Sequence, residues 1–307
     1  MHVTYYDNVR SRFLPGSGSH GTEAAVVVQM RKAQGVLARA VDGVVGSRAV
    51  VPVAVKVPLQ ITLLFWAIKI VSTAMGEALA DWLDGSAQVL IAVAGTLVAL
   101  AAFLVALRLQ FRATRYVTAV YWFAIAMVAT FGTMAADALH QFLGAPYWST
   151  TSFYAIVLAL IFWRWHVSEG TLSIHSISTR TREKFYWGAV LATFALGTAA
   201  GDWTAGDLHL NFLPSGILFA VIIVIPAIGY LLGANAIGMF WFAYVITRPL
   251  GASFADYMDY PTRNHGLGIP HPVVWGSLGA AMIALVVMLA IVERRRTVTA
   301  EPALATA

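Results

Sequence analysis

Residues 65–81 read FWAIKIVSTAMGEALAD, and the framework of this stretch returns three more times along the 307-residue chain. Each copy has a Trp, then nine residues, a Gly, four residues and an Asp, and an aromatic residue precedes each Trp. The repeated residues are Trp66, Trp122, Trp187 and Trp241; Gly76, Gly132, Gly197 and Gly251; and Asp81, Asp137, Asp202 and Asp256. Recurrence at a fixed spacing indicates an internal repeat. Its period, 54 to 65 residues between successive tryptophans, suits a pair of membrane-spanning helices.

The composition excludes an ordinary soluble protein. The chain is 59% hydrophobic and 11% charged, with a mean hydropathy of +0.73, whereas soluble domains are about 25% charged. A bilayer core needs about 20 apolar residues in a helix. Eight stretches qualify: residues 57–83, 87–107, 116–142, 149–165, 185–203, 212–232, 236–257 and 273–292. The sequence therefore predicts an all-α polytopic membrane bundle, with eight transmembrane helices from four parallel two-helix repeats.

The expected organisation has three parts. Residues 1–55 are predicted to form a cytoplasmic N-terminal arm, partly disordered, with an amphipathic surface helix within residues 23–45. Residues 56–293 form the transmembrane domain, and residues 294–307 a basic cytoplasmic tail. The repeats are expected at about residues 56–110, 111–166, 176–232 and 233–293.

The positive charge is a signal of topology. The net charge is +5, but nearly all Lys and Arg fall in loops on one side of the predicted spans. Only Arg263 falls on the other side, and Lys69 and Arg248 lie within spans. The positive-inside rule then places both termini in the cytoplasm. No nucleic-acid partner is expected. Cysteine is absent, so a metal site would use oxygen or imidazole ligands.

Each motif helix is expected to carry one polar stripe that ends in a carboxylate. Counting from each Trp, the positions 7, 11 and 15 further on share a helical face. In the first repeat these positions hold Thr73, Glu77 and Asp81. Charged groups inside a membrane face protein or water because lipid does not solvate them. Glu77 and the four aspartates are thus predicted to bind an ion or carry protons. The alternative is that each Asp lies in solvated headgroups at the end of its helix.

Two cations lie deep in predicted spans. Lys69 and Arg248 are interpreted as intramembrane counter-cations, and the structural alternative is an ion pair such as Lys69 with Glu77 or Asp256. Pro249 follows Arg248 and is expected to kink its helix, as Pro226 does more weakly in the sixth span. The four motif glycines, each followed four residues later by a small residue, are interpreted as helix-packing positions.

The histidines are a weaker signal. His140, His209, His265 and His271 are expected on the outer side, where they are either solvated or part of a metal-collecting vestibule. His175, on the inner side, is a candidate pH sensor. The sequence has no catalytic motif with its required context.

Several stretches resemble a bacterial family of integral membrane proteins built from four tandem two-helix repeats of unknown function, each with a characteristic Trp. They are FWAIK at residues 65–69, FGTMAAD at 131–137, EGTLSIHSI at 169–177 and FALGTAAGD at 194–202. The similarity covers about residues 56–292. It implies the fold and a bacterial membrane location, and it carries over no functional residue.

The leading hypothesis is a secondary transporter or exporter of a small cation, a divalent metal or a proton-coupled ion, in the bacterial cytoplasmic membrane. Its partners would be the lipid bilayer and the transported cation or proton, with no cofactor, and a homo-oligomer is left open. The rival hypothesis is a non-transporting membrane sensor or assembly factor whose Asp and Trp stripes are structural. An intramembrane enzyme is disfavoured, because no nucleophile–base pair or ligand set stands out.

Overall fold

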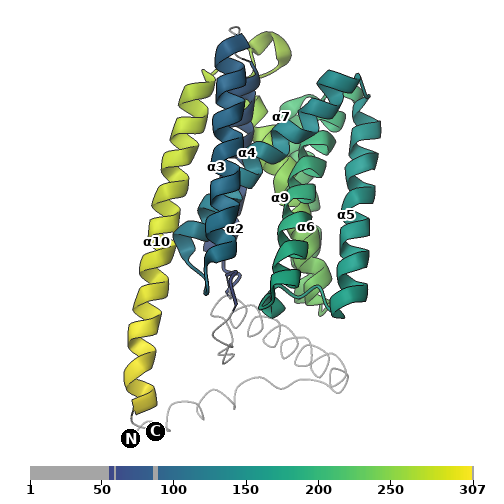
Figure 1. Cartoon of the computed structure of the whole chain (residues 1–307). Helices are drawn as coiled ribbons and strands as arrows, with labels where there is room; N and C mark the ends of the chain where they lie inside the picture. Colours follow the sequence, from purple (N-terminus) through teal and green to yellow (C-terminus); the bar gives the residue numbers. More distant parts are fainter. Residues whose placement is uncertain (1–54, 59, 86–88, 306–307) are drawn as a thin grey trace, which may run out of the picture.

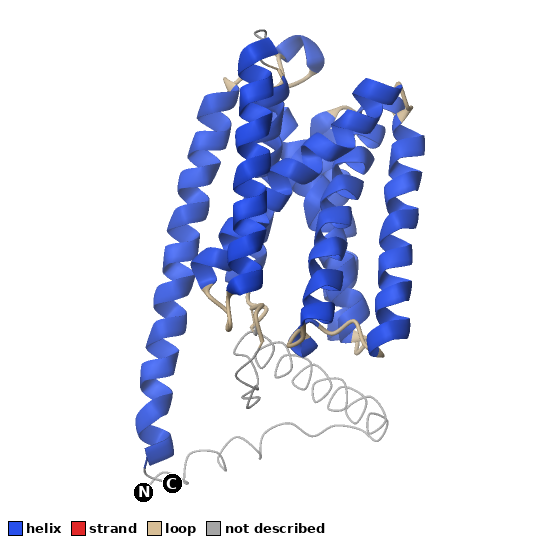
Figure 2. Ribbon diagram, in the orientation of Figure 1, coloured by secondary structure: helices blue, strands red, loops and turns tan. Residues whose placement is uncertain are grey.

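The computed structural model describes residues 55–58, 60–85 and 89–305, and within these ranges every regular element is helical (Figures 1 and 2). The predicted N-terminal arm, with its surface helix, lies outside the described residues apart from Val55. The all-helical class expected from the sequence is confirmed for the described part of the chain.

Each copy of the motif lies on one long helix. These motif helices are α2 (Leu63–Asp84), α4 (Thr118–Leu143), α6 (Arg180–Asp202) and α9 (Ala236–Asp259). Three of them begin at a residue whose side chain accepts a hydrogen bond from the first turn: Thr62, Thr179 and Asn235. Such caps satisfy backbone N–H groups that have no partner within the helix. All four helices run from a tryptophan end to an aspartate end.

A second helix follows each motif helix. These return helices are α3 (Val89–Arg112), α5 (Tyr147–Glu169), the pair α7 (Phe212–Ile222) and α8 (Val224–Leu231), and α10 (His271–Ala305). The pair α7 and α8 is one predicted span, interrupted at Ile223, three residues before Pro226. Proline removes a backbone donor and crowds the preceding turn, which explains the break. The connections contain the short elements η1 (Ile174–Ser176), η2 (Trp203–Asp207) and η3 (Thr262–Asn264).

The motif helices form a closed ring, because each packs against the next and α9 packs against α2. The motif glycines are the contact points. Each Gly meets the residue seven positions after the Trp of the next repeat: Gly76 meets Ala129, Gly132 meets Phe194, Gly197 meets Arg248, and Gly251 meets Thr73. A Cβ atom at Gly132 would lie 2.6 Å from the Cβ of Phe194, and the other three sites are similarly crowded. The glycines therefore set how closely the four helices approach.

A second cyclic contact closes the tryptophan end of the ring. The aromatic residue before each Trp packs on the Trp of the next repeat. The ring centroids are 5.4 Å apart for Phe65–Trp122, 5.8 Å for Tyr121–Trp187, 6.1 Å for Tyr186–Trp241 and 5.7 Å for Phe240–Trp66. The Tyr121 and Tyr186 hydroxyls are also hydrogen-bonded, at 2.5 Å. This aromatic layer fills the ring with side chains at that end.

The return helices surround the ring. Each packs chiefly on the motif helix of the following repeat: α3 on α4, α5 on α6, α7 on α9, and α10 back on α2. Figure 1 shows α5 beside α6 and α10 beside α2. Their outward faces are apolar, with Val98 on α3 69% exposed, Ile156 on α5 60% exposed and Ile283 on α10 67% exposed. An apolar surface that encircles the molecule is typical of contact with lipid.

Five helical segments in the described part of the chain are long and apolar enough to cross a membrane: Leu63–Asp84, Val93–Arg112, Thr118–Gln141, Phe212–Leu231 and His271–Arg296. The segments predicted as the other three spans form helices α5, α6 and α9, which are less apolar. The structure thus supports a membrane protein, and eight spans remain a prediction.

Candidate functional site

The polar stripes of the four motif helices meet inside the ring. Thr73, Glu77, Thr133, Thr198 and Arg248 come from α2, α4, α6 and α9, and all five are buried. These helices are separated by many residues in the chain, so only their packing brings the side chains together. The stripes predicted from helical periodicity therefore face the interior of the bundle.

The centre of this interior is an ion pair between Arg248 and Glu77. The Nη2 atom of Arg248 donates to Glu77 Oε2 and lies within hydrogen-bond reach of the Thr133 hydroxyl and, at 2.6 Å, of the Thr198 hydroxyl. The Nη1 atom donates to the backbone oxygen of Thr73 at 3.2 Å. Thr133 also donates to Glu77 Oε2, at 2.8 Å. Each of the four motif helices contributes, so this network ties the ring together.

The alternative in which Lys69 pairs with Glu77 or Asp256 is wrong in this structure. Lys69 is fully buried, and its Nζ atom has no hydrogen-bond partner. It lies 4.0 Å from the ring centroid of Phe194 and 4.3 Å from that of Tyr244. Lys69 stands two helical turns before Glu77, towards the aromatic layer, so its ammonium meets ring faces instead of carboxylates. Arg248, which is nearer the aspartate end, takes the carboxylate.

Pro249 does not interrupt its helix. The helix α9 runs through this position from Ala236 to Asp259. The ring of Pro249 packs beside Gly197 of α6, so it takes part in the same close contact as Arg248. Of the two predicted kinks, only the one near Pro226 coincides with a break.

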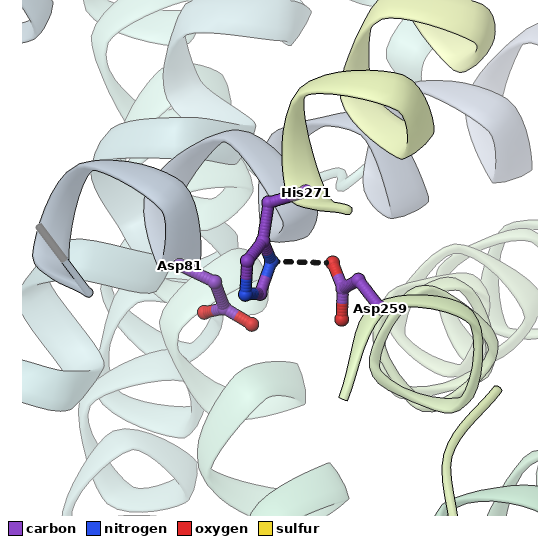
Figure 3. A group of neighbouring side chains, drawn as sticks. All are labelled: Asp81, Asp259 and His271. Atoms are coloured by element: carbon purple, nitrogen blue, oxygen red, sulfur yellow. Dashed lines mark ion pairs between the residues drawn. The ribbon is translucent and has the colours of Figure 1, made fainter. Parts of the chain in front are cut away.

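The carboxylates beyond the ion pair form two groups. In the inner group, oxygen atoms of Glu77, Asp202 and Asp256 all lie within 4.8 Å of one another. In the outer group, Asp81 joins Asp259 and His271 within the same distance. Figure 3 shows the imidazole of His271 between the two carboxylates. Asp137 belongs to neither group, so the fourfold repetition of the Asp does not produce four equivalent ligands.

Asp259 was not predicted as a site residue. It ends α9 and lies three residues after Asp256, which places both on one face of the helix. That spacing was the available signal, but the repeat framework stops at Asp256. Asp259 becomes a candidate ligand in the structure because His271, at the start of α10, lies 3.0 Å away.

The predicted vestibule of four histidines does not form. His209 and His265 are exposed. His140 contacts the backbone oxygen of Ala145 at 2.8 Å and stacks on Tyr147. Of these four histidines, His271 alone lies beside carboxylates, because the loop after α9 returns the chain directly over α2 and α9.

These groups are suited to a cation. Both offer several oxygen atoms in a protected setting, and the outer group adds an imidazole nitrogen; such atoms bind divalent metal ions. The inner group adjoins a fixed guanidinium, so a cation that enters would compete with Arg248 for Glu77. Carboxylates also carry protons, which links cation binding to pH.

The ring of motif helices, the outer return helices and the buried carboxylates define an all-helical repeat protein of membrane type with an acidic interior. The chain belongs to the family described as Repeat of Unknown Function (DUF347), which matches residues 64–116, 120–171, 185–233 and 239–295. The four matched segments confirm the internal repeat predicted from the sequence. No curated protein and no solved structure matches the chain.

Proposed function

We propose that this protein is a secondary transporter or exporter of a small cation, a divalent metal with proton coupling, and not an enzyme. The observation that carries the proposal is the inner group, in which Glu77, Asp202 and Asp256 approach within 4.8 Å inside a closed ring of helices. Three carboxylates with only one paired arginine leave excess negative charge. A cation or protons must balance this charge, because uncompensated ions are costly in a membrane interior.

The proposed location is the bacterial cytoplasmic membrane, with eight spans and both termini in the cytoplasm. The apolar outward faces of the return helices support a location in a membrane. The basic inner loops support the orientation. At the tryptophan end, Arg182 of α6 pairs with Glu169 at the end of α5 across the loop between them, and Lys56 before α2 pairs with Glu183 of α6.

The proposed mechanism follows from the order of groups along the ring. From the aspartate end inwards come the aspartates, then Glu77 with Arg248, then Lys69, and finally the aromatic layer. A cation enters the carboxylates from the aspartate end and displaces Arg248 from Glu77. The aromatic layer blocks its exit at the other end, so transport requires the motif helices to separate there. Protons return on the same carboxylates, which gives exchange.

The test is cation flux into proteoliposomes, with a panel of divalent ions and a pH-sensitive dye. Asp202→Asn is compared with Asp207→Asn, the same substitution five residues further on at an exposed position. We expect saturable flux in the wild type and in Asp207→Asn, and its loss in Asp202→Asn that still purifies as one species. Absence of flux for every ion, or equal flux in the two variants, contradicts the proposal.

The second candidate is a non-transporting membrane sensor or assembly factor. It is favoured by the Arg248–Glu77 pair, which satisfies both charges without any ligand. It predicts stable protein partners, including further copies of this chain, and no flux. Chemical crosslinking in membranes, followed by purification, distinguishes it from the transporter.

A further inference from the structure

We propose that Asp81, Asp259 and His271 form a binding site for one divalent transition-metal ion of the Zn²⁺ and Co²⁺ class. The site lies at the aspartate end of the bundle, where the fourth repeat closes on the first. Its three ligands come from three elements: Asp81 from α2, Asp259 from the end of α9 and His271 from the start of α10. Its role as the entry site for the transported cation rests on the proposed function, whereas the binding itself does not.

The geometry is close to that of a metal site. The His271 Nδ1 and Asp259 Oδ2 atoms are 3.0 Å apart. Two ligands bound at about 2.1 Å to one ion are separated by about 3.0–3.4 Å, so this pair already has the required spacing. One carboxylate oxygen each of Asp81 and Asp259 and one ring nitrogen of His271 all lie within 4.8 Å of one another. Figure 3 shows the three side chains side by side, with the imidazole of His271 between the carboxylates of Asp81 and Asp259.

Unpartnered polar atoms also point to a ligand. The Asp259 side chain is 0% exposed. Neither of its two oxygen atoms has a hydrogen-bond partner, and neither has the buried Oδ2 atom of Asp81. A buried carboxylate oxygen without a partner is costly, and the nitrogen of His271 lies 3.0 Å from only one of the two Asp259 oxygens. A metal ion bound by the three residues would give these orphaned oxygens a partner.

The donor set selects the class of metal. Imidazole favours Zn²⁺ and related transition metals over Mg²⁺ and Ca²⁺, which prefer sets of oxygen ligands. Three protein ligands leave further positions on the ion open to water, as in exchangeable rather than structural metal sites. A site from which a metal ion is passed on to a second site needs such open coordination positions.

The outer group lies about one helical turn from the inner group on each of two helices. Asp81 lies four residues after Glu77 on α2, and Asp259 lies three residues after Asp256 on α9. One turn of helix is about 5.4 Å. A metal ion leaving Asp81 and Asp259 therefore finds the next carboxylate one turn deeper on the same two helices.

The experiment measures Zn²⁺ bound to the purified full-length protein in detergent by equilibrium dialysis, with Mg²⁺ in large excess as a competitor. His271→Asn is compared with His265→Asn, the same substitution at an exposed histidine in the loop that precedes α10. We expect His271→Asn to weaken binding at one site at least about 10-fold, since even the loss of groups behind the ligands costs about 10–100-fold. His265→Asn should bind like the wild type, and Mg²⁺ should not displace Zn²⁺.

A third variant separates metal binding from the structural role of the ion pair. Asp81→Asn leaves the contact between Asp259 and His271 intact, so it should fold normally and still lose Zn²⁺. Unchanged Zn²⁺ binding in both His271→Asn and Asp81→Asn, or displacement by Mg²⁺, overturns the inference. If Zn²⁺ binding depends on His271 while the wild type shows no flux, the site stands and the transport proposal fails. If flux depends on Asp202 but Zn²⁺ binding does not depend on His271, the transport proposal stands and the metal site fails.

Discussion

Replacing Glu77 by Gln should strongly destabilise the protein. The substitution keeps the shape of the side chain but leaves the Arg248 guanidinium, which is 0% exposed, without a charged partner in direct contact. Removing one partner of a buried ion pair typically costs about 3–5 kcal/mol of unfolding free energy. The Gln amide oxygen and the Thr198 hydroxyl still accept hydrogen bonds from Arg248. We therefore expect the lower end, about 3 kcal/mol.

The assay is equilibrium unfolding in mixed micelles with increasing SDS, followed by circular dichroism. The matched control is Glu169→Gln, which breaks the pair of Glu169 with Arg182 at 2.7 Å, near the surface, where the side chains are 17% and 24% exposed. Fully exposed pairs are worth about 0.2–1 kcal/mol, and this pair is partly exposed, so this variant should lose clearly less than Glu77→Gln.

The double variant Glu77→Gln with Arg248→Met tests whether the cost arises from the pair. Removing both charges together should destabilise less than the sum of the two single changes, with a coupling of about 1–3 kcal/mol. If Glu77→Gln costs no more than Glu169→Gln, or if the two changes at the pair are simply additive, the buried ion pair does not hold the ring together and the reasoning is wrong.

Three further predictions concern packing, an unpaired charge and pH. In the same assay, Gly251→Ala should lower the unfolding free energy by about 1–3 kcal/mol, because the added methyl group overlaps Thr73. The control Gly276→Ala, which has open space around it, should not lose stability. Equal effects of the two substitutions would contradict the role of the motif glycines. Lys69→Met should leave the unfolding free energy unchanged or raise it by about 1 kcal/mol or more, because the buried ammonium has no hydrogen-bond partner. A clear loss of stability would show that the contacts of the ammonium with the aromatic rings of Phe194 and Tyr244 outweigh the cost of its desolvation. Burial raises the pKa of Glu183 from its ordinary value of 4.5 despite an ion pair with a lysine, so the native state binds this proton more tightly than the unfolded state. The unfolding free energy should then fall as pH rises from 4.5, and Glu183→Gln should flatten that part of a pH series; an unchanged slope would refute the assignment.

The repeated motif predicted the main features of the fold. Helical periodicity decides which side chains share a face, so the stripe through Trp66, Thr73, Glu77 and Asp81 could be drawn without coordinates. The fixed position of each Gly likewise indicated close helix packing, which the contact of Gly251 with Thr73 now explains. These features depend on the spacing of residues within one helix or on the exact repetition of a motif, and both can be read directly from the amino-acid sequence.

The partners of the charged groups could not be predicted in this way. Lys69 and Arg248 both lie deep in their helices, but Lys69 shares α2 with Glu77, whereas Arg248 lies on α9. Whether Arg248 reaches Glu77 depends on the axial offset between α2 and α9. The close contact between Gly251 of α9 and Thr73 of α2 fixes that offset. A shift of one helical turn between α2 and α9 would take Arg248 away from Glu77, and nothing in the local sequence excludes it.

The sequence by itself determined the number of repeats, their helical nature and the face that each stripe presents, because all three follow from spacing along the chain. Only the tertiary structure decided that Arg248 pairs with Glu77, that Asp137 stands apart, and that Asp81 meets Asp259 and His271. The physical reason is that spacing fixes directions within a helix, whereas contacts across the ring require the helices to be placed and rotated against one another. Packing alone supplies that placement.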